Sequence, residues 1–178
     1  MKIKILLLSF VLGIMVAFCL VGIASATTEY TTQVIPLVNV DPGGGLSIVS
    51  GTTGENNNLI DFGHLGPGTT QGKTLTLGVT ANGAWSLTVS KSRDLKDDST
   101  GKTILSSNFN FTSNGPDGPT YTTSDTEFGT TASPANVATN GPATSSCNVN
   151  VIYKLVIPAD QAAGYYTAPY HTYTLIVQ

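Results

Sequence analysis

Short stretches in which apolar and polar residues alternate recur along the chain and predict β-strands. The two clearest lie at residues 73–80 and 84–90, where every second side chain is apolar. That is the period of a strand with one buried face. The Asn-Gly pair between them is the strongest short signal for a hairpin. We therefore predict a half-buried hairpin, with Trp85 and Leu87 facing the core.

Similar short apolar stretches bounded by turn residues continue along the rest of the chain. Strand-like segments occupy residues 46–49, 59–63, 103–111, 148–157 and 170–177. Residues 113–146 hold few apolar side chains, but a structureless loop of that length is unusual in a compact domain. Short strands and turns are therefore expected there, with disorder as the alternative. Helical apolar periodicity over ten residues or more does not occur. The pattern predicts an all-β fold, a single antiparallel β-sandwich of roughly seven to ten strands.

The first 26 residues have the pattern of a secretory signal peptide. Lys2 and Lys4 precede an uncharged apolar run, residues 5–23, which ends in Ala-Ser-Ala. A basic start, an apolar stretch and small residues at the cleavage site predict export, with cleavage before Thr27. The mature chain is then secreted or held at the cell surface. An uncleaved signal segment is the alternative, and it is the one route to membrane contact that the sequence offers.

Residues 27–45 precede the predicted sandwich domain, residues 46–178. They contain a strand-like segment, Thr31–Val40, and a glycine-rich joint, residues 41–45. Pro36 has no backbone N–H to donate to a neighbouring strand, so this strand should lie at the edge of a sheet or carry a bulge. The apolar residues that would make it an assembly strand are Val34, Ile35, Leu37 and Val38. It either pairs within its own sandwich, which we expect, or is donated to a neighbouring molecule.

Charge and cysteine content narrow the range of partners. Without Lys2 and Lys4, six of the eight Lys and Arg residues remain against eleven Asp and Glu, a net charge of about −5. No basic cluster is present, so nucleic acid is not an expected partner. Cys147 is the one cysteine that survives cleavage, so no intrachain disulfide forms. A buried thiol is expected, and a bridge to another molecule is the alternative.

The sequence offers little support for catalysis, and we expect neither an enzyme nor a bound cofactor or metal. His64 and His171 are the two histidines, and their spacing matches no zinc pattern. No nucleophile elbow or phosphate-binding loop occurs, and the acidic residues are scattered over loops without pointing to a glycosidase pair. Calcium at the charge-dense loop 93–101 is a minor alternative, because its spacing lacks the EF-hand pattern. Its carboxylates are Asp94, Asp97 and Asp98.

A cluster of tyrosines near the C-terminus is a candidate contact surface. Tyrosine tolerates half-burial because its ring is apolar and its hydroxyl is polar. The tyrosines of this cluster are Tyr165, Tyr166, Tyr170 and Tyr173.

Two segments together resemble the WxL domain of Gram-positive surface proteins. The first contains Leu59-Ile60-Asp61-Phe62-Gly63 and then Trp85-x-Leu87; the second contains Ile157-Pro158-Ala159, Gly164-Tyr165-Tyr166-Thr167-Ala168 and Tyr173-x-Leu175. The resemblance spans residues 59–177, with Tyr173 where the family usually has a second tryptophan. It implies a non-catalytic structural or adhesion protein held noncovalently at the cell wall. The implied partners are a wall polymer or other surface proteins, and the motif residues are Trp85, Leu87, Tyr173 and Leu175.

A second resemblance points to a different role. Leu65-x-Pro67-Gly68, a strand, and then Asn82-Gly83 with another strand are similar to the TasA/camelysin type of exported fibre subunit. Such subunits join by donating an N-terminal strand to a neighbour. This resemblance implies the alternative function, a self-assembling extracellular filament subunit of a pilin or biofilm matrix.

Overall fold

The computed structural model describes residues 42–53, 59–168 and 170–178, and within them it confirms the all-β fold. The predicted signal peptide and the segment Thr31–Val40 lie outside the described residues. Ser106–Asn108 forms one short 3-10 turn. The strands are β1 (Gly44–Ser50), β2 (Thr70–Ala81), β3 (Trp85–Lys91), β4 (Leu95–Lys96), β5 (Thr103–Ile104), β6 (Phe109–Asn114), β7 (Thr120–Tyr121), β8 (Thr126–Glu127), β9 (Gly129–Thr130), β10 (Ala135–Gly141), β11 (Thr144–Val156) and β12 (His171–Val177).

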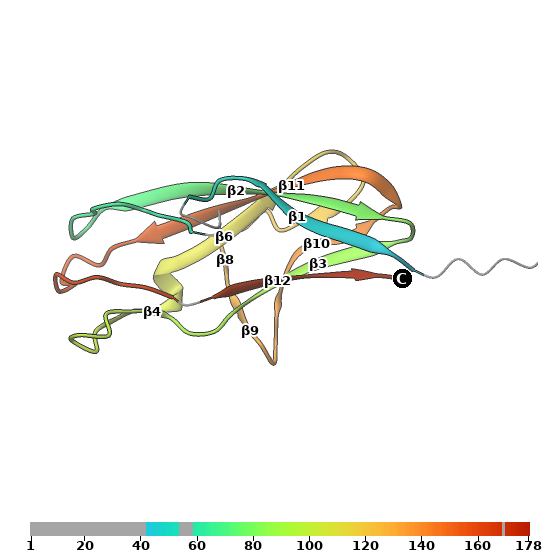
Figure 1. Cartoon of the computed structure of the whole chain (residues 1–178). Helices are drawn as coiled ribbons and strands as arrows, with labels where there is room; N and C mark the ends of the chain where they lie inside the picture. Colours follow the sequence, from blue (N-terminus) through green and yellow to red (C-terminus); the bar gives the residue numbers. More distant parts are fainter. Residues whose placement is uncertain (1–41, 54–58, 169) are drawn as a thin grey trace, which may run out of the picture. The chain divides into compact units, whose positions relative to one another are not determined.

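The strands form two sheets whose apolar faces enclose the core (Figure 1). The first sheet has the order β1-β2-β11-β6-β8 and is antiparallel throughout. The second has the order β12-β3-β10-β7, and β9 pairs with β3 in parallel. Strands β4 and β5 form a separate two-stranded ribbon. Five strands, β4, β5, β7, β8 and β9, have two residues each, which raises the number of strands above the expected range.

Strand β11 is the centre of the first sheet, and its alternation follows the sequence pattern. It pairs with β2 on one side and with β6 on the other. Every second side chain faces the core and is buried: Cys147, Val149, Val151, Tyr153 and Leu155. Because the period of a strand is two residues, the residues between them face outward.

The predicted hairpin is wrong in its pairing, although both of its strands form. Strand β2 belongs to the first sheet and β3 to the second, so the short link at Asn82-Gly83 crosses from one layer to the other. Neither Asn82 nor Gly83 has the positive φ that a tight hairpin turn requires. The apolar faces of the two strands instead meet across the core, where Leu77, Val79 and Leu87 are all at most 2% exposed.

In two other segments the structure differs from the predicted strands. Residues 60–63 form no strand, because the carboxylate of Asp61 accepts a hydrogen bond from the backbone N–H of Gly63 at 2.8 Å and holds Gly63 at φ 70°. Such a side-chain turn competes with strand pairing. Residues 103–111 split into β5 and the start of β6. The expected short strands within residues 113–146 are confirmed as β7 to β10.

Within the part of the chain that the structure describes, no helix has the length and apolar character needed to cross a bilayer.

Candidate functional site

The two motifs of the WxL resemblance meet on neighbouring strands. Strands β3 and β12 pair in antiparallel fashion, and Leu175 lies directly opposite Leu87. Tyr173 lies opposite Val89, and Val177 lies opposite Trp85. The pairing therefore joins the four motif residues into one patch on the inner face of the second sheet.

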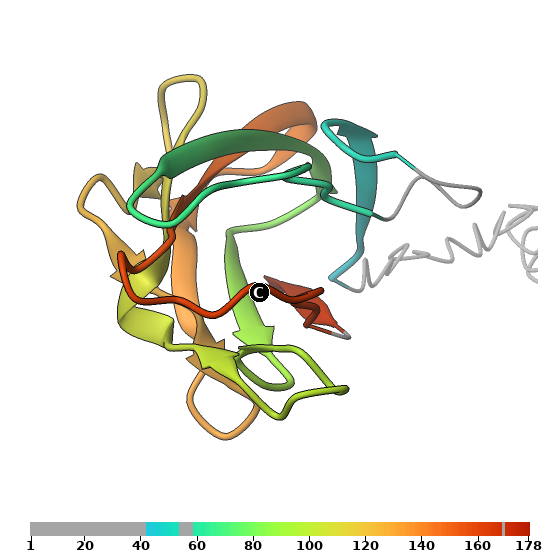
Figure 2. The same cartoon turned by 90° about the vertical axis from the view of Figure 1, so that its left-hand side faces the viewer.

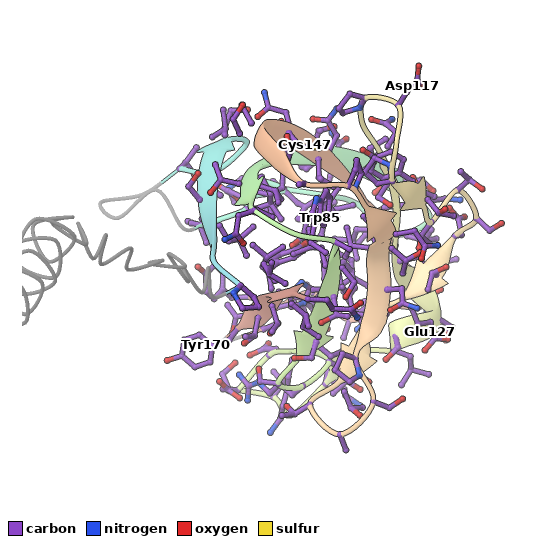
Figure 3. All side chains as sticks on the ribbon, turned by 90° about the vertical axis from the view of Figure 1, so that its right-hand side faces the viewer. Trp85, Asp117, Glu127, Cys147 and Tyr170 are labelled. Atoms are coloured by element: carbon purple, nitrogen blue, oxygen red, sulfur yellow. The ribbon has the colours of Figure 1, made fainter. Side chains whose placement is uncertain are left out.

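Trp85 and Leu87 are core residues, as predicted. Trp85 is 2% exposed and Leu87 is 0% exposed, and Figure 3 shows Trp85 in the interior. The indole N–H of Trp85 donates a hydrogen bond to the backbone carbonyl of Pro142 at 2.7 Å. Gly141 packs against the ring so closely that a Cβ there would lie 2.1 Å from Cε2 of Trp85. The indole is therefore fixed inside the sandwich, away from the surface.

Tyr173 links its strand to the opposite sheet. Its hydroxyl and that of Tyr153 on β11 form a hydrogen bond of 2.7 Å. Burial raises the pKa of both phenols. The bond satisfies polar groups that would otherwise cost free energy in the core, so Tyr173 has a structural partner on the opposite sheet.

His171, at the start of β12, belongs to an aromatic cluster in the core. Its ring is stacked on that of Tyr153, with centroids 5.6 Å apart and an interplanar angle of 10°, and its centroid lies 4.2 Å from that of Phe128. Burial, and then the nearby charge of Lys91, lower the pKa of His171 to about 4. The imidazole is thus neutral at ordinary pH and packs as an aromatic side chain.

Strands β1 and β12, which each form one edge of a sheet, lie near each other (Figure 2). A surface groove lies between them. Its volume is about 490 Å³. The lining residues are Pro42, Gly43, Gly44, Leu46, Tyr173, Thr174, Leu175 and Val177. Two residues of the second motif thus border a surface groove as well as the core. The β1 residues were missed by the sequence analysis, because nothing local indicates that β1 and β12 are neighbours.

Glycine allows the two edges to meet at one end of this groove. A Cβ on Gly44 would lie 2.8 Å from Cγ2 of Val177 and 3.1 Å from Cδ2 of Leu175. The neighbouring Gly43 donates its backbone N–H to Oδ1 of Asn82 at 2.7 Å, and its carbonyl accepts from the backbone N–H of Asn82 at 3.0 Å. The start of β1 is therefore fixed beside the link between β2 and β3.

The carboxylates of the charge-dense loop are each engaged by protein groups. Asp94 accepts hydrogen bonds from Lys91 at 2.5 Å and from Ser106 at 2.6 Å, and Lys91 also contacts Ser106. Burial alone would raise the pKa of Asp94, but these partners hold it below its usual value.

Asp98 and Asp97 are held in different ways. Arg93 binds Asp98 through two hydrogen bonds of 2.9 and 2.8 Å. Asp97 accepts from the backbone N–H and the hydroxyl of Ser99, at 2.8 and 2.6 Å, and from Thr100 at 2.9 Å. Among the described residues, no group of three or more potential metal ligands comes together. The hydrogen bonds of these carboxylates connect residues within the loop.

The tyrosine cluster divides into exposed and engaged members. Tyr165 is 81% exposed and Tyr170 is 72% exposed, and Figure 3 shows Tyr170 projecting from the surface. Tyr166 is partly buried, and its hydroxyl accepts from Gln161 and donates to the carbonyl of Ala162, both at 2.7 Å. Tyr173 faces the interior. Tyr165 and Tyr170 are thus the members available for contact with a partner.

Two further candidates from the sequence are Cys147 and the possible assembly strand. Cys147 is a free, buried thiol, as expected. The possible assembly residues Val34, Ile35, Leu37 and Val38 lie outside the described residues.

The comparisons with known proteins leave the family open. No protein-family model and no curated protein matches the sequence. Among solved structures, the chain is similar to part of a family 123 glycoside hydrolase from Clostridium perfringens, with 13% identity and a TM-score of 0.39. That similarity covers 77% of this chain and 24% of the hydrolase, so the chain spans about a quarter of the length of that protein.

Proposed function

We propose that this chain is a non-catalytic structural protein of the cell exterior that associates noncovalently with a cell-wall polymer. The observation that carries the proposal is the pair of exposed rings, Tyr165 and Tyr170, on the segment between β11 and β12. Exposed tyrosine rings offer an apolar face and a polar edge, which suits contact with sugars. The sandwich behind them is stabilised by the buried side chains of Trp85 and Leu87, which act as structural support.

A pelleting assay tests this proposal. The mature protein, mixed with purified Gram-positive cell walls, should sediment with them. The double variant Tyr165→Ala, Tyr170→Ala should remain in the supernatant, while Leu105→Ala, which truncates another exposed apolar side chain, should sediment like the wild type. Equal sedimentation of all three proteins, or none by the wild type, would count against binding through these rings.

Self-assembly into filaments is a second candidate, which the β1–β12 groove favours. An unpaired sheet edge is a template for an additional strand, and both edges of the groove are unpaired within the described residues. Under this hypothesis, negative-stain microscopy of the purified mature protein should show filaments without any cell wall present. Leu175→Arg, which places a charge in the groove, should abolish them. Ile176→Arg, on the outward face of the same strand, should not.

A further inference from the structure

Strand β12 forms one edge of the second sheet, and it has none of the features that usually protect an edge. Its seven residues pair with β3 without a register shift, and they include no charged residue, glycine or proline. Of the other three strands that end the two sheets, β7 and β8 have two residues each, and β1 contains two glycines and a register shift. Long, regular and uncharged edges are templates for pairing with another strand. Among the described edges, β12 is therefore the one best suited to continue its sheet into a partner.

The backbone groups of β12 alternate between its neighbour β3 and the free edge. The N–H of Gln178 donates to the carbonyl of Ala84 at 2.8 Å, and the carbonyl of Tyr170 accepts from the N–H of Ser92 at 3.1 Å. Because the direction of these groups alternates along a strand, the even-numbered residues of this segment bond to β3. The N–H and C=O groups that point to the free edge belong to the odd-numbered residues: His171, Tyr173, Leu175 and Val177.

This alternation fits a second copy of the same strand. When two β12 strands lie antiparallel about a two-fold axis at Thr174, Tyr173 lies opposite Leu175 of the other copy. In the same register His171 lies opposite Val177 of the other copy. Both pairs consist of residues whose backbone groups point to the free edge, so each pair can exchange two hydrogen bonds. All seven residues of β12 take part, and every side chain keeps its inward or outward direction.

The side of the sandwich next to β12 also exposes apolar side chains. Ile48 lies opposite Leu77 in the β1–β2 register, so both face the core side of the first sheet. Leu77 is 2% exposed, whereas Ile48 is 47% exposed. On the outward face of β12, Ile176 is also 47% exposed. In the two-fold arrangement the β1–β12 grooves of the two copies face each other, and Ile176 lies beside Thr172 of the other copy. The pairing thus covers apolar surface as well as backbone groups.

We propose that this chain forms a two-fold symmetric dimer in which β12 pairs with β12 of a second copy. The second sheet then continues from one molecule into the other, with four strands from each copy in the order β7-β10-β3-β12 and its reverse. Such a sheet lies within the usual limit of about ten strands. The contact uses the same surface of both copies, so it is closed and does not propagate. The dimer concerns a different contact from wall binding and holds whether or not the chain binds a cell wall.

Cysteine cross-linking of the mature protein tests the register. In Thr174→Cys the two new thiols face each other across the axis, with Cα atoms about 4.5 Å apart, which suits a disulfide. Mild oxidation should convert most of this variant into a covalent dimer on a non-reducing gel. Thr172→Cys is the matched control, because its counterpart lies four residues further along the other strand, about 13 Å away. That variant should stay monomeric on the gel, as should the wild type, whose Cys147 is buried.

Analytical ultracentrifugation measures the assembly itself. The mature wild type at micromolar concentration should have twice the mass of the monomer. Thr174→Lys places like charges opposite each other across the axis and should give the monomer mass. Thr88→Lys, at the facing position on β3, adds the same charge to the same outer face away from the axis and should leave the dimer intact.

Four results would overturn the proposal. They are a monomeric wild type, a dimeric Thr174→Lys protein, a mass that keeps rising with concentration, and covalent dimers of Thr172→Cys as abundant as those of Thr174→Cys. A rising mass would instead indicate an open assembly such as a filament.

Discussion

The hydroxyl groups of Tyr153 and Tyr173 lie 2.7 Å apart and join β11 of one sheet to β12 of the other. Tyr153 is 2% exposed and Tyr173 is partly buried, so the hydroxyl of Tyr173 is the partner that the buried hydroxyl of Tyr153 needs. The bond therefore attaches the edge strand β12 to the centre of the opposite layer. The stability of this edge depends on a polar contact as well as on apolar packing.

Removing one hydroxyl of this pair should be more harmful than removing both. Tyr173→Phe leaves the buried hydroxyl of Tyr153 without its partner, and an unsatisfied buried group costs about 1–3 kcal/mol of unfolding free energy. The double variant Tyr153→Phe, Tyr173→Phe should recover part of that loss, because no polar group is then left unpaired. Urea unfolding of the wild type, the single variants Tyr153→Phe and Tyr173→Phe, and the double variant measures the coupling. Simple additivity of the two single changes would contradict it.

Truncation of the buried indole should be among the most damaging single changes. Trp85→Ala removes a side chain that is 2% exposed, together with its hydrogen bond to Pro142, and should cost about 3–5 kcal/mol. Ile176→Ala, on the outward face of β12, should cost far less. Thermal or urea unfolding compares them, and a Trp85→Ala protein as stable as the wild type would contradict the core position.

Adding a single methyl group beneath the indole should also destabilise the fold. In Gly141→Ala the new Cβ would meet the rigid ring of Trp85 at 2.1 Å, so the ring or the strand must move. Overpacking of this kind costs about 1–3 kcal/mol. Gly72→Ala on β2 is the control, since its new Cβ would meet its nearest neighbour, the carbonyl oxygen of Tyr153, at an ordinary 3.5 Å. Equal unfolding midpoints for the two variants would show that the ring shifts freely.

Mild acid should weaken the protein through His171. Its pKa is about 4 in the folded state and near 6.5 when unfolded, so the unfolded chain binds the proton first. Stability should fall as the pH drops from about 6.5 towards 4, by at most about 3 kcal/mol. His171→Phe keeps an aromatic ring without the titration, so its stability should change less over this range. Urea unfolding at a series of pH values gives the unfolding free energy of both proteins as a function of pH. If the two proteins lose the same free energy between pH 6.5 and 4, His171 is not the cause.

Local patterns predicted the strands better than they predicted their partners. Apolar and polar residues alternate along β2, β3, β11 and β12 because one face of each strand is turned towards the core. This alternation is visible in the sequence. Whether β2 pairs with β3 depends on competing partners elsewhere in the chain, and here β11 and β12 replace the expected hairpin. Asn82 takes part in bonds to Gly43 instead of forming a tight turn.

The candidate site was predictable only in part, for a similar reason. The burial of Trp85 and Leu87 could be predicted because both residues lie on the same face of the strand as other apolar residues. The groove depends on the spatial approach of β1 to β12, which are distant in sequence and meet where Gly44 allows close contact. No local signal contains that information.

The crossing of the chain from one sheet to the other between β2 and β3 has a consequence for folding kinetics. Because the two adjacent strands do not pair with each other, β3 has no hydrogen-bonded neighbour until residues 129–141 are available, and its second long partner is the final strand, β12. Pairings between distant segments slow folding, since a large loop must close before any contact stabilises it. A chain delivered from its N-terminus therefore cannot complete its second layer before β12 has emerged. During that interval β3 lacks its partner strands, and exposed apolar surface and unpaired strand edges favour aggregation.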